Sequence, residues 1–368
     1  MILNQTPIRT SKNYGINNIN LDIEMPERIR DICPLVITGD TSDFFMSAST
    51  SKKPLVYGMG LTLERQILVG SNIDIKIEED KYKKNKTESA ENKKQKVKRN
   101  KTRNLFLNFI LNDEYPSTIE NIEFEAPSNY KTTIYIKYKT TDNSKCFHNG
   151  LIRVNAKPNS ETNIVVINML NKNSSNFLSI ENILEESSNV NYTIVDFGGK
   201  TSITNYYSKL EGKGAKANIN TIYLGKDEQV FDINYIAELF GENTETNIEV
   251  QGALKDEAKK NFKGTIDFKK GSKKAKGDEN EFCMLLSDKA KSKALPMLLC
   301  TEEDVEGNHS SSAGRIEDDK LFYIMSRGLS EKDAMKLIVK AKFNKILETI
   351  KDEDLKEIIV QEIDRRLD

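Results

Sequence analysis

The sequence contains little of what a disulfide-stabilised or cysteine-ligated protein needs. Only four cysteines occur in 368 residues, and no two of them stand at the CxxC spacing. Scattered cysteines argue against a disulfide framework and against a zinc or cluster site built from cysteine alone. Most of the four are therefore expected to be small buried hydrophobes.

Net charge and long apolar runs are lacking as well. The 55 Lys and Arg residues nearly balance the 56 Asp and Glu residues, so no global basic field favours nucleic acid binding. No segment approaches the roughly 18 apolar residues of a membrane span. The first residues, MILNQTPIRTSKNYG, lack the basic and apolar regions of a signal peptide. These absences predict a cytoplasmic protein that binds neither nucleic acid nor membrane.

Residues 1–104 form an N-terminal region in which few elements can be predicted. Between about 78 and 103 it reads EEDKYKKNKTESAENKKQKVKRNKTR, almost without apolar residues. Such a stretch cannot bury enough surface to offset the entropy lost on ordering. It is predicted to be a flexible, lysine-rich loop, and the alternative is a basic tract that contacts an acidic partner or nucleic acid.

Residues 105–328 are predicted to be a β domain. Ile134, Ile136 and Tyr138 alternate with more polar neighbours, and similar short runs recur up to about Cys300 between Gly, Asn, Asp and Ser turns. The pattern alone fits a sandwich, a barrel or a β-solenoid. The length of the strand-rich region favours the solenoid, because a single sandwich rarely extends so far.

The hydrophobic period becomes helical in residues 329–368. Ser330 can cap a first helix while Asp333 reaches back, and apolar residues then recur at helical spacing. A second helix is predicted from about Glu353. The mainly β chain should therefore carry a C-terminal helical segment, which either packs on the β domain or binds a partner.

One segment imitates a phosphate-binding loop. Gly198-Gly199-Lys200-Thr201 follows an expected strand, but the earlier glycine of the motif is replaced by Ile194 and the following residues are strand-like. A turn between strands is the better interpretation, and no nucleotide site is predicted.

Residues 285–328 carry a recognisable pattern, LLSDKAKSKALPMLLCTEEDVEGNHSSSAGRIEDDKLFYIMSRG. A strand is followed by Val-x-x-x-His, small residues, Gly-Arg-Ile-Glu, LFY, SRG and an amphipathic helix. This resembles the SufB/SufD family of iron–sulfur cluster assembly proteins and is nearest to its SufD branch. The stretch QGALKDEAKKNFKGTIDFKKGS from Gln251 is also similar to the family.

The resemblance implies a fold and a set of partners. Family members have a right-handed parallel β-helix core flanked by helical segments. The chain is accordingly expected to be a non-enzymatic scaffold subunit that pairs with a SufB homologue and binds the ATPase SufC through its C-terminal helices. It would share a transient iron–sulfur cluster with its partner, and ATP hydrolysis would belong to SufC.

The resemblance also identifies candidate site residues. His309, expected on a polar turn, would be a cluster or iron ligand. Cys283 and Cys300 are weaker candidates, because both lie in apolar runs where burial would raise the thiol pKa. SufB proteins have a cysteine in Gln-Cys-Asp-Ser-Met-Leu and glutamates on both sides of the histidine. Here Glu281 takes the cysteine's place, and Asn308-His309-Ser310 has no carboxylate.

These departures point to the SufD-type partner. Two alternatives remain open. The chain could be the sole SufB-like scaffold of a minimal system containing SufC, self-paired as a homodimer. More remotely, it could be a β-solenoid enzyme acting on carbohydrate, which would require a carboxylate cluster on one face.

Overall fold

The computed structural model describes residues 1–8, 14–26, 33–49, 51–79 and 102–368. Most of the lysine-rich stretch, residues 80–101, lies outside the described residues. Strand accounts for 50% of the chain and helix for 16%. The strands are β1 Ile2–Leu3, β2 Ile19–Asn20, β3 Leu35–Gly39, β4 Phe44–Ser47, β5 Ile73–Glu79, β6 Arg103–Leu111, β7 Ser117–Ala126, β8 Lys131–Thr140, β9 Phe147–Ala156, β10 Glu161–Met169, β11 Ser175–Leu184, β12 Asn189–Asp196, β13 Thr201–Leu210, β14 Lys216–Gly225, β15 Val230–Leu239, β16 Glu245–Leu254, β17 Lys259–Phe268, β18 Ala275–Leu285, β19 Lys291–Cys300 and β20 Val305–Gly314. The helices are α1 Leu61–Gly70, α4 Asp318–Met325, α5 Glu331–Leu347 and α6 Glu353–Leu367.

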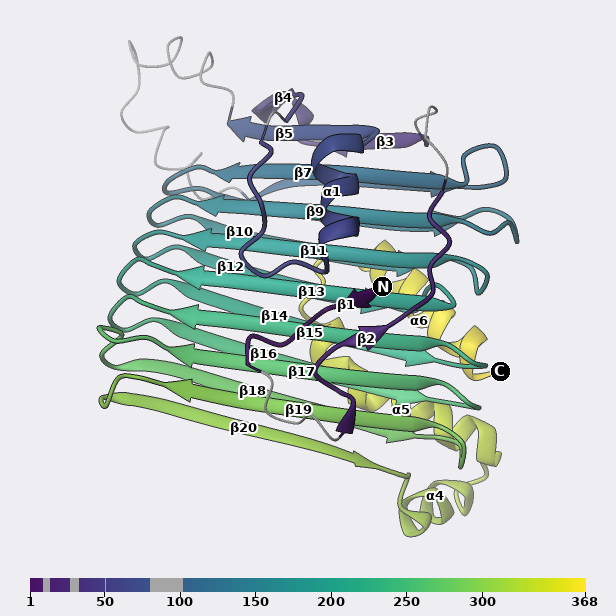
Figure 1. Ribbon diagram of the computed structural model, residues 1–368. Helices are drawn as coiled ribbons and strands as arrows, with labels where there is room; N and C mark the ends of the chain where they lie inside the picture. The colour runs from purple at the N-terminus through teal and green to yellow at the C-terminus, as the bar shows by residue number, and fades with distance from the viewer. Residues whose placement is uncertain (9–13, 27–32, 50, 80–101) are drawn as a thin grey trace.

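From β5 onward, successive strands alternate between two stacked sheets, while β1 and β2 form a separate antiparallel pair (Figure 1). The β20 sheet has the order β20-β18-β16-β14-β12-β10-β8-β6-β3, and the β19 sheet has the order β19-β17-β15-β13-β11-β9-β7-β5-β4. All neighbours are parallel from β5 and β6 onward, whereas β3 and β4 pair antiparallel at the other end. The result is a β-solenoid of about 7 turns.

One corner of each coil is made by a residue with a left-handed backbone. These residues fall between an odd strand and the next even one, and they are Asn129, Asn159, Ser187, Gly214, Asn243 and Lys274. The backbone N–H of each donates to the corresponding turn of the next coil, as from Asn159 to Glu186 at 3.0 Å. Asn and Gly tolerate this conformation best, which explains why polar turn residues recur along the sequence. A ladder of bonded turns therefore runs along one edge of the solenoid.

The space between the sheets forms the main core. Alternate residues of each strand point inward, and the period of two seen at Ile134, Ile136 and Tyr138 places all three in this core. Polar groups are buried there too, and most of them are paired. Asp196, for example, accepts hydrogen bonds from Ser202 at 2.6 Å and Asn168 at 2.8 Å. The interior is thus apolar with polar networks inserted into it.

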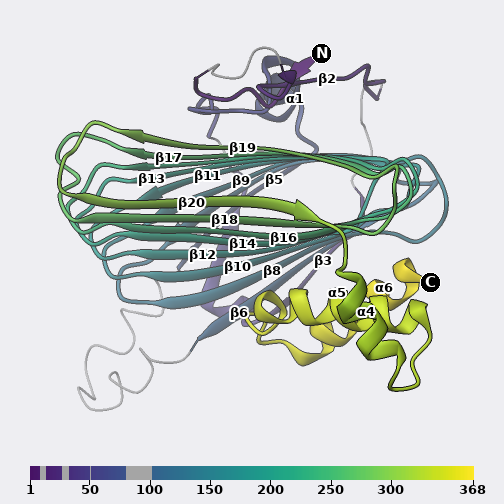
Figure 2. The same ribbon diagram turned by 90° about the horizontal axis from the view of Figure 1, so that it is seen from below.

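The outer faces of the two sheets are covered by different segments, as Figure 2 shows. The N-terminal segment and α1 lie on the β19 sheet, where Leu63 and Ile67 pack with Leu151 and Phe177. The C-terminal helices α5 and α6 lie on the β20 sheet, and their apolar contacts extend from Tyr135 of β8 to Met284 of β18. Each layer buries a stripe of the sheet that would otherwise face water.

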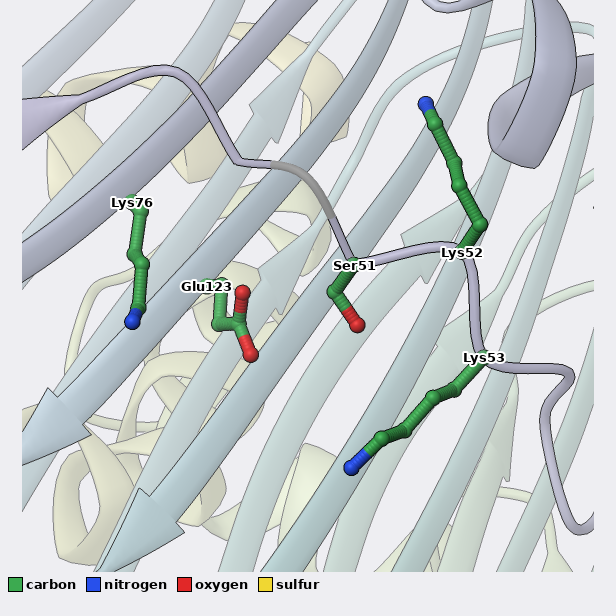
Figure 3. Close-up of a pocket in the computed structure, with 5 residues that line it drawn as sticks. All are labelled: Ser51, Lys52, Lys53, Lys76 and Glu123. Carbon is green, nitrogen blue, oxygen red and sulfur yellow. The ribbon is translucent and has the colours of Figure 1, made fainter.

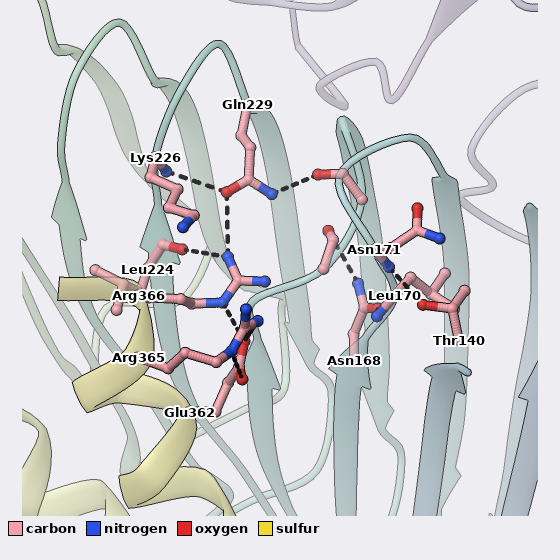
Figure 4. A network of polar contacts seen from close by, with 12 residues as sticks. Thr140, Asn168, Leu170, Asn171, Leu224, Lys226, Gln229, Glu362, Arg365 and Arg366 are labelled. Atoms are coloured by element: carbon pink, nitrogen blue, oxygen red, sulfur yellow. Dashed lines mark hydrogen bonds and ion pairs between the residues drawn. The ribbon is translucent and has the colours of Figure 1, made fainter. Parts of the chain in front are cut away.

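The end of α6 is fastened to the solenoid by one arginine (Figure 4). Arg366 is 6% exposed and donates to Glu362, to Gln229 at 3.2 Å and to the Leu224 carbonyl. Gln229 donates in turn to the Gly199 carbonyl at 2.5 Å. The segment that imitates a phosphate loop is therefore a turn between β12 and β13 that takes part in this anchor.

The prediction of a mainly β chain with a solenoid core and C-terminal helices is confirmed. Ser330 caps α5 by accepting from the Asp333 N–H at 3.1 Å, and α6 begins at Glu353. Two helices before Ser330 were not predicted from the sequence, α1 in the N-terminal region and α4 at Asp318–Met325. The eight residues of α4 have no buried member, so this helix gives little periodic signal.

Candidate functional site

The two ends of the solenoid differ in how they are finished. At the N-terminal end, β3 and β4 close the sheets with antiparallel pairs. At the other end, β20 and β19 are the last strands of their sheets. Most of β20 is exposed, and its outer edge pairs with no strand among the described residues. We call this region the open end.

His309 lies in the middle of β20, so its expected position on a polar turn is wrong. Its Cα is in register with Glu279 of β18. Registered residues of parallel strands point to the same face, and Glu279 is buried between the sheets, so His309 faces the interior side. Because no further strand covers it, the histidine is exposed.

The neighbours of His309 point the other way and are already paired. Asn308 donates to Asp278 at 2.9 Å, and Ser310 donates to Asn280 at 2.7 Å. These positions hold glutamates in SufB-like sequences. In this chain they form part of an outer polar ladder between β18 and β20.

Glu279 is the most unusual group at the open end. It is 1% exposed, and neither carboxylate oxygen has a hydrogen-bond partner. Burial, and after it the charge of Glu281, raises the pKa of the Glu279 carboxyl to about 8. The side chain fits because β17 has Gly264 opposite, where an added Cβ would come within 2.2 Å of the carboxylate.

Glu281 is buried beside Glu279 but has its partners. Lys260 of β17 donates to Glu281 Oε1 at 2.6 Å, and both side chains of this ion pair are 0% exposed. Ser311 of β20 donates to the other oxygen at 2.7 Å. The Glu281 carboxylate is thus held by a buried ammonium group and by the strand that carries His309.

The two cysteine candidates lie in different surroundings. Cys283 is buried on the inward face of β18, and burial raises the pKa of its thiol. Cys300, the last residue of β19, is exposed, and its Sγ contacts the Glu302 carbonyl at 2.8 Å. The expectation that Cys300 is buried is therefore wrong, because the apolar run that contains it lies on the last strand of its sheet.

The candidates do not form a complete metal site by themselves. Across the described ranges, no group of three or more His, Cys, Asp or Glu side chains is placed to hold a metal ion. Sequence reasoning also missed Glu279 and Lys260. The alternation of Glu279, Glu281 and Cys283 was the available signal, because with period two all three share the inward face.

A hollow of about 460 Å³ lies away from the open end, on the β19 sheet (Figure 3). Ser51, Lys52, Lys53, Lys76 and Glu123 line it. Lys76 pairs with Glu78 at 3.0 Å, and Lys52 lies 3.8 Å from Asp74. The hollow is open, and these charges have partners, so it is a weaker candidate for a functional site than the open end.

Residues 109–342 match the family model described as the SufBD core domain of SUF system FeS cluster assembly. The chain belongs to the SufBD family. The region matched contains the end of β6 and the solenoid from β7 through β20, together with α4 and most of α5.

Several SufBD relatives are similar over part of their length. The SufD protein of Bacillus subtilis is 30% identical over 166 residues, which are 45% of this chain and 38% of the relative. A SufBD family protein of Pyrococcus horikoshii is 32% identical over 171 residues, 46% of this chain and 37% of the relative. The SufD protein of Escherichia coli is 22% identical over 237 residues, 64% of this chain and 56% of the relative. The matches thus span between 37% and 56% of these relatives.

None of the helices in the described part of this SufBD chain is long and apolar enough to cross a membrane.

Proposed function

We propose that this SufBD chain is a SufD-like, non-enzymatic scaffold subunit of a cytoplasmic iron–sulfur cluster assembly complex. It pairs with a SufB homologue at the open end and binds the ATPase SufC through its C-terminal helices. The observation that carries the proposal is the open end itself, where a strand edge, an exposed imidazole and buried carboxylates occur together.

The edge of β20 supports pairing at this end. A strand at the edge of a sheet presents a row of backbone N–H and C=O groups that can accept another strand. β20 is ten residues long, lacks proline, and carries no Lys or Arg that would discourage such pairing. A second solenoid could therefore continue the sheet and at the same time cover His309.

His309 is proposed as a ligand of the nascent cluster or its iron. Imidazole nitrogen is a common ligand for iron, and the exposed position allows a second chain to approach. Because the described residues bring no three metal ligands together, the remaining ligands would come from SufB. Glu281 stands where a SufB-like chain would have its cysteine, which favours a SufB partner over a homodimer.

The C-terminal helices offer a surface for SufC. Large apolar side chains of α4 and its flank are exposed, namely Phe322 at 73%, Tyr323 at 59%, Met325 at 38% and Leu329 at 37%. Exposed apolar patches of this kind often mark protein interfaces. The buried faces of α5 and α6 are already used on the β20 sheet, but Leu337 of α5 at 47% and Ile358 of α6 at 41% are exposed as well.

The complex is tested by co-expression of this chain with SufB and SufC homologues. The subunit ratio and the iron and sulfide content of the purified complex are then measured. We expect one copy of this chain with one SufB. His309→Ala should lower iron and sulfide while leaving the subunit ratio unchanged. Cys300→Ala is the control and should leave cluster content intact. An unchanged cluster yield in the histidine variant would remove the ligand role, and a stable homodimer that excludes SufB would favour the sole-scaffold alternative.

Binding of SufC is tested by point substitutions. Truncation after Gly328 would strip α5 and α6 from the β20 sheet and expose its apolar face, so its effect would be ambiguous. Phe322→Ser with Tyr323→Ser changes only exposed side chains and should abolish co-purification of SufC while SufB still binds. Val69→Ser, which alters an equally exposed apolar residue on α1, is the matched control.

A further inference from the structure

Burial of the Glu279 carboxylate costs free energy, and no hydrogen bond or ion pair in the described structure offsets this cost. Other buried carboxylates have donors: Glu281, between the sheets, has Lys260, and Asp232, on the outer face of the β19 sheet, has Lys263 and Asn4. In the parts of the chain that are described, Glu279 is the one carboxylate with both oxygens buried and unpartnered. Burial of such a group without a partner is unfavourable, and a bound cation is one of the few ways to compensate it.

The surrounding backbone makes room for this carboxylate. Gly264 lies opposite on β17, and any larger residue there would collide with it, since an added Cβ would lie 2.2 Å from Oε1. The space that the Glu279 side chain occupies is therefore provided by the backbone of β17 at Gly264. On the side of the open end, the next strand is β20, and no strand of the described residues follows it in the sheet.

The residue next to Glu279 on that side is His309. Their Cα atoms are registered partners on adjacent parallel strands, and such strands lie about 4.8 Å apart. Both side chains project from the interior face, while Asn308 and Ser310 project from the other face and are bonded there. The exposed imidazole and the buried, unpartnered carboxylate thus come from adjacent positions on the interior side of β20 and β18.

We propose that Glu279 is a metal-binding residue, forming with His309 a two-ligand site for a divalent transition metal, iron(II) in particular. Imidazole nitrogen with carboxylate oxygen is a ligand combination that non-haem iron(II) sites use. Glu279 thereby supplies from the neighbouring strand the carboxylate that positions 308 and 310 lack. The inference rests on the proposed function through the iron-ligand role of His309.

The step is a coordination without electron transfer. One carboxylate oxygen and one imidazole nitrogen replace two waters of the hydrated metal ion, and a carboxyl group that holds a proton releases it to solvent on binding. Two protein ligands make a weak site. Its remaining positions stay open to water, to sulfide or to ligands of a second chain.

The experiment uses the full chain without partners, under anaerobic conditions. Cobalt(II) is titrated by absorbance and iron(II) by competition with a chelator, at pH 8. Glu279→Gln should weaken binding at least about tenfold, the lower end of effects seen when residues supporting a metal site are replaced, and His309→Ala should do the same. Asp278→Asn is the matched control, one position away on the opposite face, and should bind as the parent does.

A second variant keeps the test independent of altered folding. Glu279→Cys places a thiol in the same space, and a thiolate bound to cobalt(II) gives a charge-transfer absorption in the near ultraviolet. The band, measured against the parent protein, should appear in this variant and vanish when His309→Ala is added. Its absence from a folded variant would overturn the proposal.

The outcomes separate this inference from the proposed function. If His309→Ala weakens metal binding but Glu279→Gln does not, Glu279 is no ligand, and the iron-ligand role of His309 stands. If neither substitution changes binding, both assignments fail. Pairing of Glu279→Gln with the SufB homologue, measured by subunit ratio, should be unchanged in every case, so a loss of pairing would instead show that Glu279 supports the interface.

Discussion

The chain has only two histidines, and they lie toward opposite ends of the solenoid. His148 in β9 is 0% exposed, and its ring nitrogens contact Asn176 at 2.5 Å and Glu120 at 2.7 Å. Tyr138 donates to the same glutamate at 2.7 Å. His309 in β20 is exposed, and its neighbour Glu279 has no donor.

Both ends therefore combine a histidine with a buried glutamate, but only His148 has both ring nitrogens paired, and only Glu279 has both oxygens unpartnered. Around His148, Glu120 and Asn176 of the neighbouring strands pair with the two ring nitrogens, and Tyr138 of the opposite sheet packs on the ring. At the open end, one side has no strand. A polar group that serves stability is surrounded by partners, whereas one that serves binding is left with unused capacity.

The largest effect is expected for the buried ion pair one coil inside the open end. Lys260→Met leaves Glu281 without its cation and should lower the free energy of unfolding by about 3–5 kcal/mol, measured by chemical denaturation. Adding Glu281→Leu removes the unpaired charge and should restore most of the loss. If the double variant is as unstable as the single one, packing and not charge accounts for the cost.

His148→Ala tests the satisfied histidine. It removes one hydrogen-bond partner from Asn176 and one from Glu120 and leaves a cavity, so stability should fall by about 3 kcal/mol. Iron content of the assembled complex, corrected for folded protein, should stay at the parent level. A stable variant with reduced iron content would reverse the roles assigned to the two histidines.

Asp196 lies between the two ends and is a buried carboxyl with hydrogen-bond partners. Its titration should make the stability of the fold depend on pH. Burial raises its pKa to about 6, although Ser202, Asn168, the Gly198 backbone and Arg366 oppose the shift. Between about pH 4 and 6 the folded chain holds a proton that the unfolded chain has released, so stability falls as pH rises through this window, by about 2–3 kcal/mol, and is level above it.

Asp196→Asn should remove this slope. Denaturation measured at several pH values between 4 and 7 gives the comparison, and the readout is the slope and not the absolute stability. Equal slopes in parent and variant would assign the pH dependence to another group.

The smallest effect on folding is expected for His309→Ala. The His309 side chain is exposed and makes no hydrogen bond to another described residue. The melting temperature should therefore stay within error of the parent value. Thermal unfolding of the two histidine variants side by side measures the contrast. A clear loss of stability in this variant would make the open end a structural feature like the covered one.

Regular features were predictable from the sequence because local rules decide them. Alternation at Ile134, Ile136 and Tyr138 marks an inward face, and Ser330 with Asp333 marks a helix start. The position of His309 was not predictable in this way. The small polar residues around His309 look like a turn in the sequence. Both faces of β20 are largely exposed, so this strand needs no alternation of apolar residues. Cys300 misleads for the complementary reason, because an apolar run predicts burial only where something covers it.

The candidate site was predictable in part. The resemblance selects His309, but the orphaned state of Glu279 depends on Gly264, fifteen positions earlier and on the other sheet. No local pattern encodes that pairing. The register between coils also varies, with 28 residues from Glu161 to Asn189 and 30 from Ala275 to Val305, so facing residues could not be assigned by counting.

The contact of α5 and α6 with strands from β8 to β18 has a consequence for how the molecule unfolds. Stacked coils that touch only their neighbours fray from a free end, one repeat after another. A helical pair that spans many coils, fixed near its end by Arg366, ties distant repeats into one cooperative unit. The open end can then remain without a covering strand. The helices α5 and α6, packed along the β20 sheet, keep the last coils from unfolding separately.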